Sequence, residues 1–272
     1  MTRLSLDCLT LTNTRPADLI RAASAAGFDL ISLWINPPAA YPSQLVTPNM
    51  VRECASVLAD TGIRIQGMEA FDMVSAESVR AFRPSLEIGA HLGGRTVLAY
   101  HGENPDRTQV VNALAAFVEL ANEYGLGVNF EPVAMGQTKT LAQAQALIRD
   151  ARVDAGILFD SYHLVRSGGS AADLRTVAPG VIRYVQINDG PTHVPQEGML
   201  VEASSERLYP GEGSFPLVDL LRSVPTDVPW GIEAPSLRRA RAGLSPHAQA
   251  QEAMQALQRL LKRVGDPRIA HR

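Results

Sequence analysis

Four apolar runs in the second half of the chain each carry an oxygen-donating side chain at or near their carboxyl end. The four side chains are Glu131, Asp160, Gln186 and Glu233. If the runs are neighbouring parallel strands, these side chains meet at one end of the sheet. Three carboxylates and one amide oxygen form a hard donor set that suits Mn²⁺, Mg²⁺ or Co²⁺ better than tetrahedral zinc. Because crowded carboxylates repel one another without a cation between them, the sequence predicts a divalent metal site.

The third ligand position has an alternative donor. Asp189 lies three residues after Gln186 and also carries carboxylate oxygens. We favour Gln186, because the chain is expected to have left the sheet by Asp189. A single acid that closes a strand is more often a helix N-cap or a solvated group. The metal prediction therefore depends on the four positions together.

Strand-like and helix-like segments alternate eight times along the chain. The strands are expected at 4–8, 28–35, 63–68, 95–100, 127–131, 156–160, 182–188 and 230–233. The helices are expected at 16–26, 48–61, 76–91, 108–124, 141–151, 170–177, 215–221 and 246–264. Such alternation is typical of a parallel sheet whose crossovers are helical. Eight cycles in 272 residues predict an α/β fold, a closed (β/α)8 TIM barrel that forms a single domain over residues 1–272.

An open, doubly wound sheet is the main alternative architecture. It would need a glycine-rich turn after its first strand to hold a dinucleotide, and residues 8–16 contain no glycine. The chain also has no Walker-type phosphate loop. These absences favour the closed barrel.

Composition excludes several classes of function. A formal net charge of −3 and a pI near 6.1 provide no general attraction to nucleic acid or to anionic membranes. Lysine occurs only at positions 139 and 262, which disfavours Schiff-base chemistry and a lysine base. Two distant cysteines, Cys8 and Cys54, indicate buried thiols rather than a disulfide framework.

The first residues contain no extended apolar segment, and no stretch of about 18 uncharged apolar residues occurs anywhere. We therefore expect a soluble cytoplasmic protein that acts on a small molecule. Neither a nucleic acid nor a membrane is expected as a partner, and the formation of a homo-oligomer stays open.

A linked pattern of short segments extends over the second half of the chain. The segments are Asn129-Phe130-Glu131-Pro132, Asp160-Ser161-Tyr162-His163, Val185-Gln186-Ile187-Asn188-Asp189, Arg207 with Pro210-Gly211-Glu212-Gly213, and Glu233. Together they resemble the xylose-isomerase-like TIM barrels, and the resemblance covers nearly the whole chain. That family includes sugar isomerases and epimerases, hydroxypyruvate isomerase, inosose and dehydroshikimate dehydratases, and nucleases of the endonuclease IV type.

The resemblance implies roles for the residues that match it. It implies Glu131, Asp160, Gln186 and Glu233 as metal ligands. Many members have histidine where Gln186 stands, although the hydroxypyruvate isomerase branch is similar to this chain in using glutamine, so the identity of the metal stays open and zinc is included. In the epimerase branch, the glutamates that match Glu131 and Glu233 also act as acid and base. His163 would contact a hydroxyl or carbonyl of the substrate.

Four further residues are expected near the same mouth of the barrel. Arg207 lies in a long loop and is a candidate to bind a substrate carboxylate or phosphate, unless it is solvated. Glu69 and His101 follow the third and fourth strands and are candidate substrate or supporting groups. Trp34, near the end of the second strand, is expected to form an apolar wall against the substrate or to close the core.

These features favour a metal-dependent isomerase or epimerase of a small sugar or other polyhydroxylated carbonyl compound. A metal bound to a carbonyl and its neighbouring hydroxyl acidifies the intervening C–H and stabilises an enediolate. A dehydratase acting on a cyclic hydroxyketone, such as an inosose or dehydroshikimate, is the alternative. A barrel that binds metal without catalysis is less expected. A nuclease is disfavoured, because the six histidines do not supply a trinuclear zinc site and the net charge is acidic.

Overall fold

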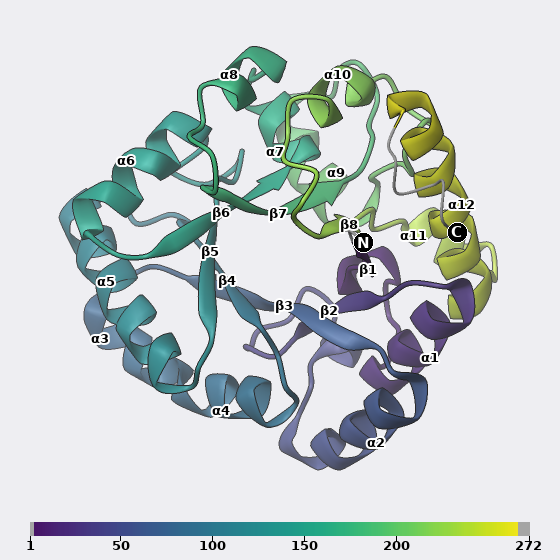
Figure 1. The fold of residues 1–272 in the computed structure, drawn as a ribbon, viewed down its shortest axis with the longest axis horizontal. Coiled ribbons are helices and arrows are strands. Elements are labelled where there is room, and N and C mark those ends of the chain that lie inside the picture. Colours follow the sequence, from purple (N-terminus) through teal and green to yellow (C-terminus); the bar gives the residue numbers. More distant parts are fainter. Residues whose placement is uncertain (1–2, 266–272) are drawn as a thin grey trace.

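The computed structural model describes residues 3–265, in which eight parallel strands close into a barrel (Figure 1). The strands are β1 (Leu4–Leu6), β2 (Leu30–Trp34), β3 (Arg64–Asp72), β4 (Thr96–Tyr100), β5 (Gly127–Glu131), β6 (Ala155–Asp160), β7 (Ile182–Ile187) and β8 (Trp230–Ile232). Each strand pairs with the next, and β8 returns to β1 through the Leu4–Trp230 pairing. The predicted (β/α)8 barrel is thereby confirmed. Residues 1–2 and 266–272 of the expected domain, His271 among them, lie outside the described residues.

The helices surround the barrel as an outer ring (Figure 1). They are α1 (Pro16–Ala26), α2 (Val51–Thr61), α3 (Ala76–Val79), α4 (Arg83–His91), α5 (Arg107–Glu123), α6 (Leu141–Ala151), α7 (Ser161–Arg166), α8 (Ala171–Arg175), α9 (Met199–Ser205), α10 (Leu217–Leu221), α11 (Leu237–Arg241) and α12 (Pro246–Val264). Short 3₁₀ turns are η1 (Cys8–Thr10), η2 (Pro42–Gln44), η3 (Pro48–Met50), η4 (Arg80–Phe82) and η5 (Gln196–Gly198).

Local sequence accounts for several helix ends. Pro16 occupies the first turn of α1, where its missing N–H costs no hydrogen bond, and Gly27 ends the helix in the left-handed region at φ +84°. Helix α6 begins with a capping box in which Thr140 and Gln143 each satisfy the other's backbone N–H. These signals explain why both helices have the predicted bounds.

Several predicted bounds differ from the structure, for example the helix expected at 48–61, which consists of η3 and α2. The differences at the third strand and at the helix expected at 76–91 have clear physical causes. Strand β3 continues to Asp72, so Glu69 is not its last residue. The single helix expected at 76–91 is divided into α3, η4 and α4, with a proline in the first turn of α4. Proline removes a helical hydrogen bond and restricts the residue before it, so a continuous helix cannot pass through Pro84 without disruption.

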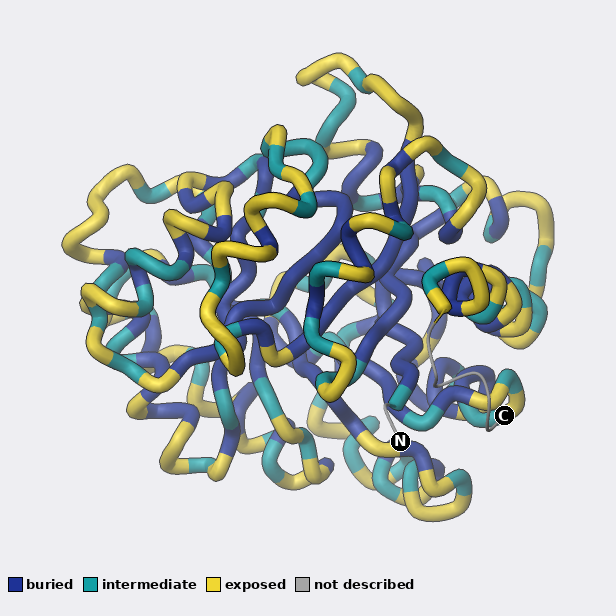
Figure 2. Tube along the Cα trace, turned by 45° about the horizontal axis from the view of Figure 1, so that its top comes forward, coloured by how far each residue is buried: buried dark blue, intermediate teal, exposed yellow. Residues whose placement is uncertain are grey.

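The apolar core has an outer and an inner part. Outside the barrel, Phe71 of β3 packs against Phe117 of α5 with ring centroids 4.9 Å apart, and Phe82 contacts both. Inside it, Leu98 and Tyr184 belong to a small separate cluster. Figure 2 shows the buried barrel within a more exposed periphery. Other positions inside the barrel can therefore carry polar side chains.

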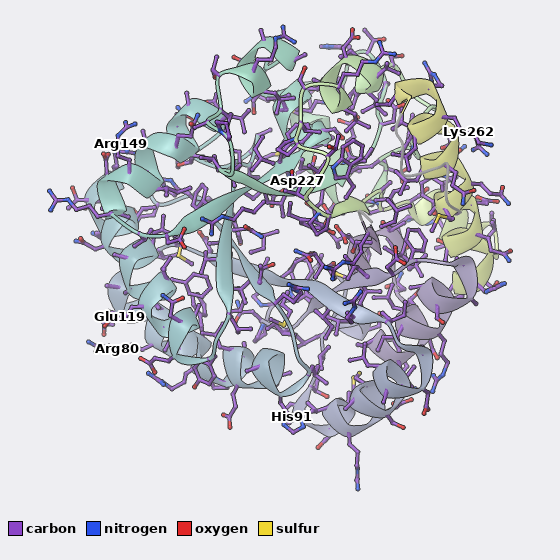
Figure 3. The ribbon with its side chains drawn as sticks, in the orientation of Figure 1. Arg80, His91, Glu119, Arg149, Asp227 and Lys262 are labelled. Atoms are coloured by element: carbon purple, nitrogen blue, oxygen red, sulfur yellow. The ribbon has the colours of Figure 1, made fainter. Side chains whose placement is uncertain are left out.

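The periphery carries the exposed charge. Glu119, Arg149 and Lys262 are exposed and project from the outer helices (Figure 3). None of the helices within residues 3–265 is both long and apolar enough to cross a membrane. Both cysteines are buried free thiols, as predicted.

Candidate active site

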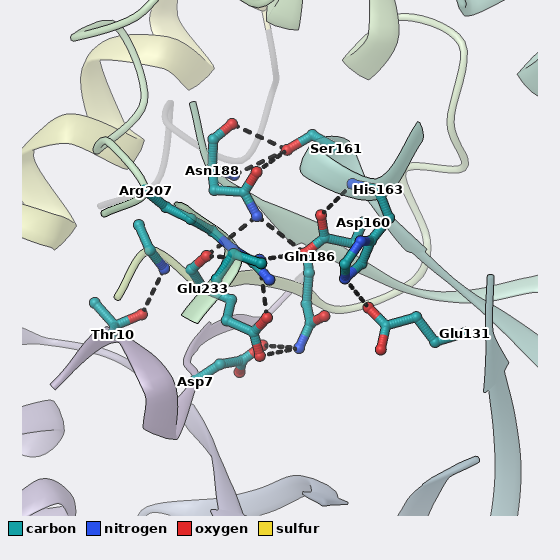
Figure 4. Close-up of polar contacts among 12 residues, drawn as sticks. Asp7, Thr10, Glu131, Asp160, Ser161, His163, Gln186, Asn188, Arg207 and Glu233 are labelled. Atoms are coloured by element: carbon teal, nitrogen blue, oxygen red, sulfur yellow. Dashed lines mark hydrogen bonds and ion pairs between the residues drawn. The ribbon is translucent and has the colours of Figure 1, made fainter. Parts of the chain in front are cut away.

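The strand ends bring the four predicted metal ligands to one end of the barrel (Figure 4). Glu131 and Asp160 are the last residues of β5 and β6. Gln186 lies beside Asp160 in the sheet register, and Glu233 directly follows β8. All four side chains are buried. A polar cluster therefore occupies the mouth of the barrel.

Arg207 lies between two of these carboxylates. Its Nη1 atom donates to Oδ2 of Asp160 over 2.9 Å and to Oε2 of Glu233 over 3.0 Å. Its Nε atom donates to the carbonyl oxygen of Ala203 in α9, and its guanidinium lies 4.7 Å from the ring centre of Tyr162. Burial opposes the charge of Arg207, but the two carboxylates outweigh burial and raise the pKa of this side chain. Arg207 is thus a buried structural cation and not a solvated loop residue.

The amide of Gln186 has a fixed direction. Its Nε2 atom donates to Oε1 of Glu233 and to Oδ2 of Asp7, each over 2.9 Å. Because both acceptors are carboxylate oxygens, the nitrogen must face them and the carbonyl oxygen must face away. That oxygen, Oε1, is buried without a hydrogen-bond partner. Gln186 therefore has an unused oxygen ligand.

Glu131 and His163 form a second contact at the mouth. The backbone N–H of Ala134 donates to Nδ1 of His163 over 3.3 Å, which leaves the ring proton of the neutral imidazole on Nε2. Nε2 lies 3.6 Å from Oε1 of Glu131, and this oxygen has no hydrogen bond. Burial lowers the pKa of His163 to about 4, so the ring is neutral at neutral pH. The pair presents one free carboxylate oxygen and one N–H donor.

The cluster holds more negative than positive charge. Burial raises the pKa of Glu131 and of Glu233 well above the usual range, and neighbouring carboxylates add to the effect. Burial also raises the pKa of Glu69 to about 7. Within residues 3–265, no three His, Cys, Asp or Glu side chains already surround a single cation position. A cation bound by both Asp160 and Glu233 must share them with Arg207.

The donor set nevertheless suits a hard divalent cation. All four predicted ligands offer oxygen, and the unpartnered buried oxygens belong to two of them, Glu131 and Gln186. Buried polar atoms normally have partners, so two such atoms in one cluster are informative. The residues present therefore fit a bound metal ion.

A cavity of about 490 Å³ opens next to the cluster. Glu131, Glu233, His163 and Arg207 line it, whereas Asp160 and Gln186 are not among its lining residues. Trp34 and Glu69, two of the predicted substrate-binding residues, also line the cavity. The volume is large enough for a small metabolite.

The sequence model of the xylose isomerase-like TIM barrel family matches residues 20–260. The chain belongs to this family. Among curated proteins, it is 27% identical over 234 residues to a 3-dehydroshikimate dehydratase of Pseudomonas putida. The match covers 81% of this chain and 35% of the dehydratase, so the chain spans about a third of the length of that relative.

Two solved structures have a fold similar to that of this xylose isomerase-like barrel. The IOLI protein with a binding zinc atom superposes with a TM-score of 0.80 and 19% identity, and the match covers 96% of this chain and 99% of that one. An L-ribulose 3-epimerase superposes with a TM-score of 0.71 and 19% identity, and the match covers 97% of this chain and 96% of that one. At this level of identity the superpositions support the fold alone.

Two of the predicted substrate-binding residues of this xylose isomerase-like barrel, His101 and Arg207, already have partners within the protein. Both ring nitrogens of His101 are already engaged, Nδ1 with Oγ1 of Thr138 at 2.9 Å and Nε2 with the carbonyl oxygen of Asn104 at 2.5 Å. His101 does not line the cavity and instead connects two loops. Arg207 does line the cavity, and its Nη1 atom is paired with the carboxylates of Asp160 and Glu233. Its role in substrate binding stays a prediction.

Asp189, the alternative to Gln186 as a ligand, organises a loop. Its carboxylate accepts the backbone N–H groups of Gly190, Gly211, Gly213 and Phe215 over 2.9–3.1 Å. A side chain at Gly213 would collide with the carbonyl oxygen of Gly190, which explains a glycine at this close approach. With its oxygens occupied, Asp189 has a structural role in the described residues.

Sequence reasoning missed two residues of the site. Asp7 directly follows β1 and accepts hydrogen bonds from Ser5, Tyr184 and Gln186. Asn188 donates through Nδ2 to Oδ2 of Asp160 over 2.9 Å. Asp7 does show the pattern of an acid closing an apolar run, but only the closed barrel places β1 close to β7.

Proposed function

We propose that the protein is a divalent-metal-dependent isomerase or epimerase of a small polyhydroxylated carbonyl compound. The observation that carries this proposal is that Glu131 and Glu233 line one cavity although they come from β5 and the end of β8. Two carboxylates that approach a bound molecule from separate strands suit proton removal and proton return. The similarity of the fold to an L-ribulose 3-epimerase supports this choice.

The residues that would hold the metal are Glu131, Asp160, Gln186 and Glu233. When bound, the cation would supply Lewis-acid chemistry, drawing electron density from a substrate carbonyl and acidifying the neighbouring C–H. Mn²⁺, Mg²⁺ and Co²⁺ suit the oxygen donors, and zinc is kept as a candidate because a structure of similar fold is described with a zinc atom.

Residues of the chain itself would remove the substrate proton and return a proton to the product. Oε1 of Glu131 has no hydrogen bond and is the most available base. Nε2–H of His163, 3.6 Å from that oxygen, would donate a hydrogen bond to a substrate hydroxyl or carbonyl and hold the C–H beside the base. Glu233 would return a proton to the product. Trp34 would cover the carbon skeleton.

A dehydratase is the second candidate, and two observations favour it. The curated relative at 27% identity is a 3-dehydroshikimate dehydratase. The two glutamates also differ, because both oxygens of Glu233 accept hydrogen bonds, from Gln186 and Arg207, whereas one oxygen of Glu131 is free. One base is enough for elimination. Glu131 would take the proton from the α-carbon, and a C=C bond would form as the C–O bond of the β-hydroxyl breaks. Glu131 would then return the same proton to the departing hydroxyl, which leaves as water.

The two candidates are separated by turnover in D₂O. Protein loaded with Mn²⁺ is incubated with ketoses and with cyclic hydroxyketones, and the products are followed by NMR and ultraviolet absorption. An isomerase or epimerase yields a product of unchanged formula with deuterium on the carbon next to the carbonyl. A dehydratase yields a product that has lost water and absorbs as a conjugated enone. Turnover that persists in excess chelator would contradict the metal requirement, and a complete lack of turnover and exchange with Mn²⁺, Mg²⁺ and Co²⁺ would reject both candidates.

A small-molecule substrate fits both the family and the cavity. Cytoplasmic location and homo-oligomer formation stay predictions from the sequence.

A further inference from the structure

The cavity is bordered by several carboxylates and by little positive charge. The carboxylates that line it are Glu69, Asp72, Glu103, Glu131 and Glu233. Arg207 is the sole lysine or arginine among the lining residues of the described chain, and Asp160 and Glu233 already neutralise it. The lining of the cavity therefore contains more carboxyl groups than cationic side chains, and its one arginine has no unmatched charge.

A second arginine close to α9, Arg166, is also paired with a carboxylate. Arg166 of α7 is held by Glu202 of α9 in a buried pair, with Nε and Nη2 donating to the two carboxylate oxygens over 2.8 and 2.5 Å. The N-terminus of α7 is capped by the carboxylate of Asp160, which accepts the N–H of His163. Phosphates and carboxylates are normally bound by arginine, lysine or an uncapped helix N-terminus. Among the described residues that line this cavity, the one arginine or lysine is Arg207, whose Nη1 atom is already shared by Asp160 and Glu233.

Much of the remaining wall of the cavity is apolar. Its side chains include Leu9, Trp34, Leu98, Met135 and Leu200. The indole N–H of Trp34 is used by the carbonyl oxygen of Asn36 at 2.7 Å, so its contribution to the cavity is the carbon ring. Leu200 of α9 is 66% exposed, so this part of the apolar wall lies open at the surface. One side of the substrate is therefore expected to present carbon and hydrogen.

We infer that the substrate is an uncharged polyhydroxylated ketone with one apolar face, an unphosphorylated ketose or a neutral cyclic hydroxyketone, and not a sugar phosphate or a carboxylic acid. This inference deepens the proposed function and depends on it for the reaction, but the charge argument concerns binding alone. It also separates this chain from a relative that acts on 3-dehydroshikimate, which carries a carboxylate.

Matched pairs of probes test the inference. One pair is 3-dehydroshikimate and its methyl ester, and the other is D-fructose 6-phosphate and D-fructose. Binding to the Mn²⁺-loaded protein is measured by the fluorescence of Trp34 and by the shift in Tm. We expect the neutral member of each pair to bind about tenfold more tightly, since one unfavourable charge interaction in a partly buried site is of this order. The inference is overturned if the anionic member binds as tightly or more tightly, or if neither neutral member binds.

Variants at the mouth check that charge is the cause. Glu103 is exposed, and Asp72 accepts the N–H of Gly102, a bond that asparagine can also accept. Glu103→Gln and Asp72→Asn should each reduce the preference for the neutral probe by about twofold. An unchanged preference in both variants contradicts the inference.

Turnover distinguishes failure of this inference from failure of the proposed function. Tight binding of neutral probes without any reaction would reject the proposed function and support the inference. Rapid turnover of the phosphate or the acid in preference to its neutral partner would support the proposed function and reject the inference.

Discussion

Arg207 and Asp160 form a buried ion pair in which Nη1 lies 2.9 Å from Oδ2 and the two side chains are 3% and 0% exposed. The arginine comes from the loop after α9 and the aspartate from the end of β6. The same Nη1 atom reaches Glu233. Arg207 thus partly neutralises the carboxylate cluster and connects the long loop to the barrel mouth.

Replacing Arg207 by alanine should destabilise the fold strongly. Asp160 and Glu233 would stay buried without their cation, and removing one partner of such a pair costs about 3–5 kcal/mol. The free energy of unfolding is measured with urea. Added Mn²⁺ should restore part of the loss, because a divalent cation can neutralise the same carboxylates. The control is Arg107→Ala, which breaks an exposed pair with Asp150 and should cost less than about 1 kcal/mol. Equal losses in the two variants would show that the buried pair has no special role.

Replacing Asp7 by asparagine should weaken metal binding. An asparagine whose oxygen accepts from Tyr184 turns its NH₂ group toward Nε2 of Gln186, and two donors cannot face each other. Gln186 is then free to rotate, and its carbonyl oxygen no longer has a fixed direction. We expect the affinity for Mn²⁺, measured by calorimetry, to fall about 10- to 100-fold. Ser5→Ala removes another hydrogen bond to Asp7 without touching Gln186 and is the matched control. Unchanged affinity in the Asp7 variant would remove this residue from the site.

Replacing Glu131 by glutamine should abolish deuterium exchange next to the substrate carbonyl. The amide keeps the shape of the side chain but cannot accept the proton, and loss of a general base typically reduces the rate about 10²- to 10⁴-fold. Exchange is followed by NMR in D₂O with a neutral ketone. Glu119→Gln, on the exposed face of α5, makes the same chemical change far from the cavity and should have no effect (Figure 3). Exchange at the wild-type rate in Glu131→Gln would identify another base.

The stability of the protein should depend on pH through Glu69. Burial raises its pKa in the folded state to about 7, whereas the unfolded chain releases this proton near pH 4.3, roughly the ordinary value. Between these pH values the unfolded state binds fewer protons, so the stability contributed by the protonated carboxyl is lost as the pH rises.

Glu69→Gln lacks this titration and isolates its contribution. Relative to the variant, wild-type protein should lose stability between pH 4.5 and 7, by at most about 1.4 kcal/mol per pH unit. Urea unfolding in the presence of chelator measures the difference without contributions from metal binding. A difference that does not vary with pH would contradict the assigned shift.

Local signals were sufficient to predict the elements of the barrel. Apolar runs alternated with periodic helices, and the capping residues Pro16, Gly27 and Thr140 fixed helix ends by short-range sterics and hydrogen bonds. Where the structure differs from the prediction, one cause is a local residue and the other is strand pairing. Pro84 interrupts the helix expected at 76–91, and pairing with β4 extends β3 beyond Glu69.

For the site, the sequence alone determined which side chains gather at the barrel mouth, because parallel strands end on one face and Glu131, Asp160, Gln186 and Glu233 lie at strand ends. Only the tertiary structure decided what each side chain does there. Contacts across 179 and 47 residues of chain turn the Gln186 amide toward Asp7 and bring Arg207 to Asp160. Such pairings depend on barrel closure and on loop paths, which no local pattern in the sequence encodes.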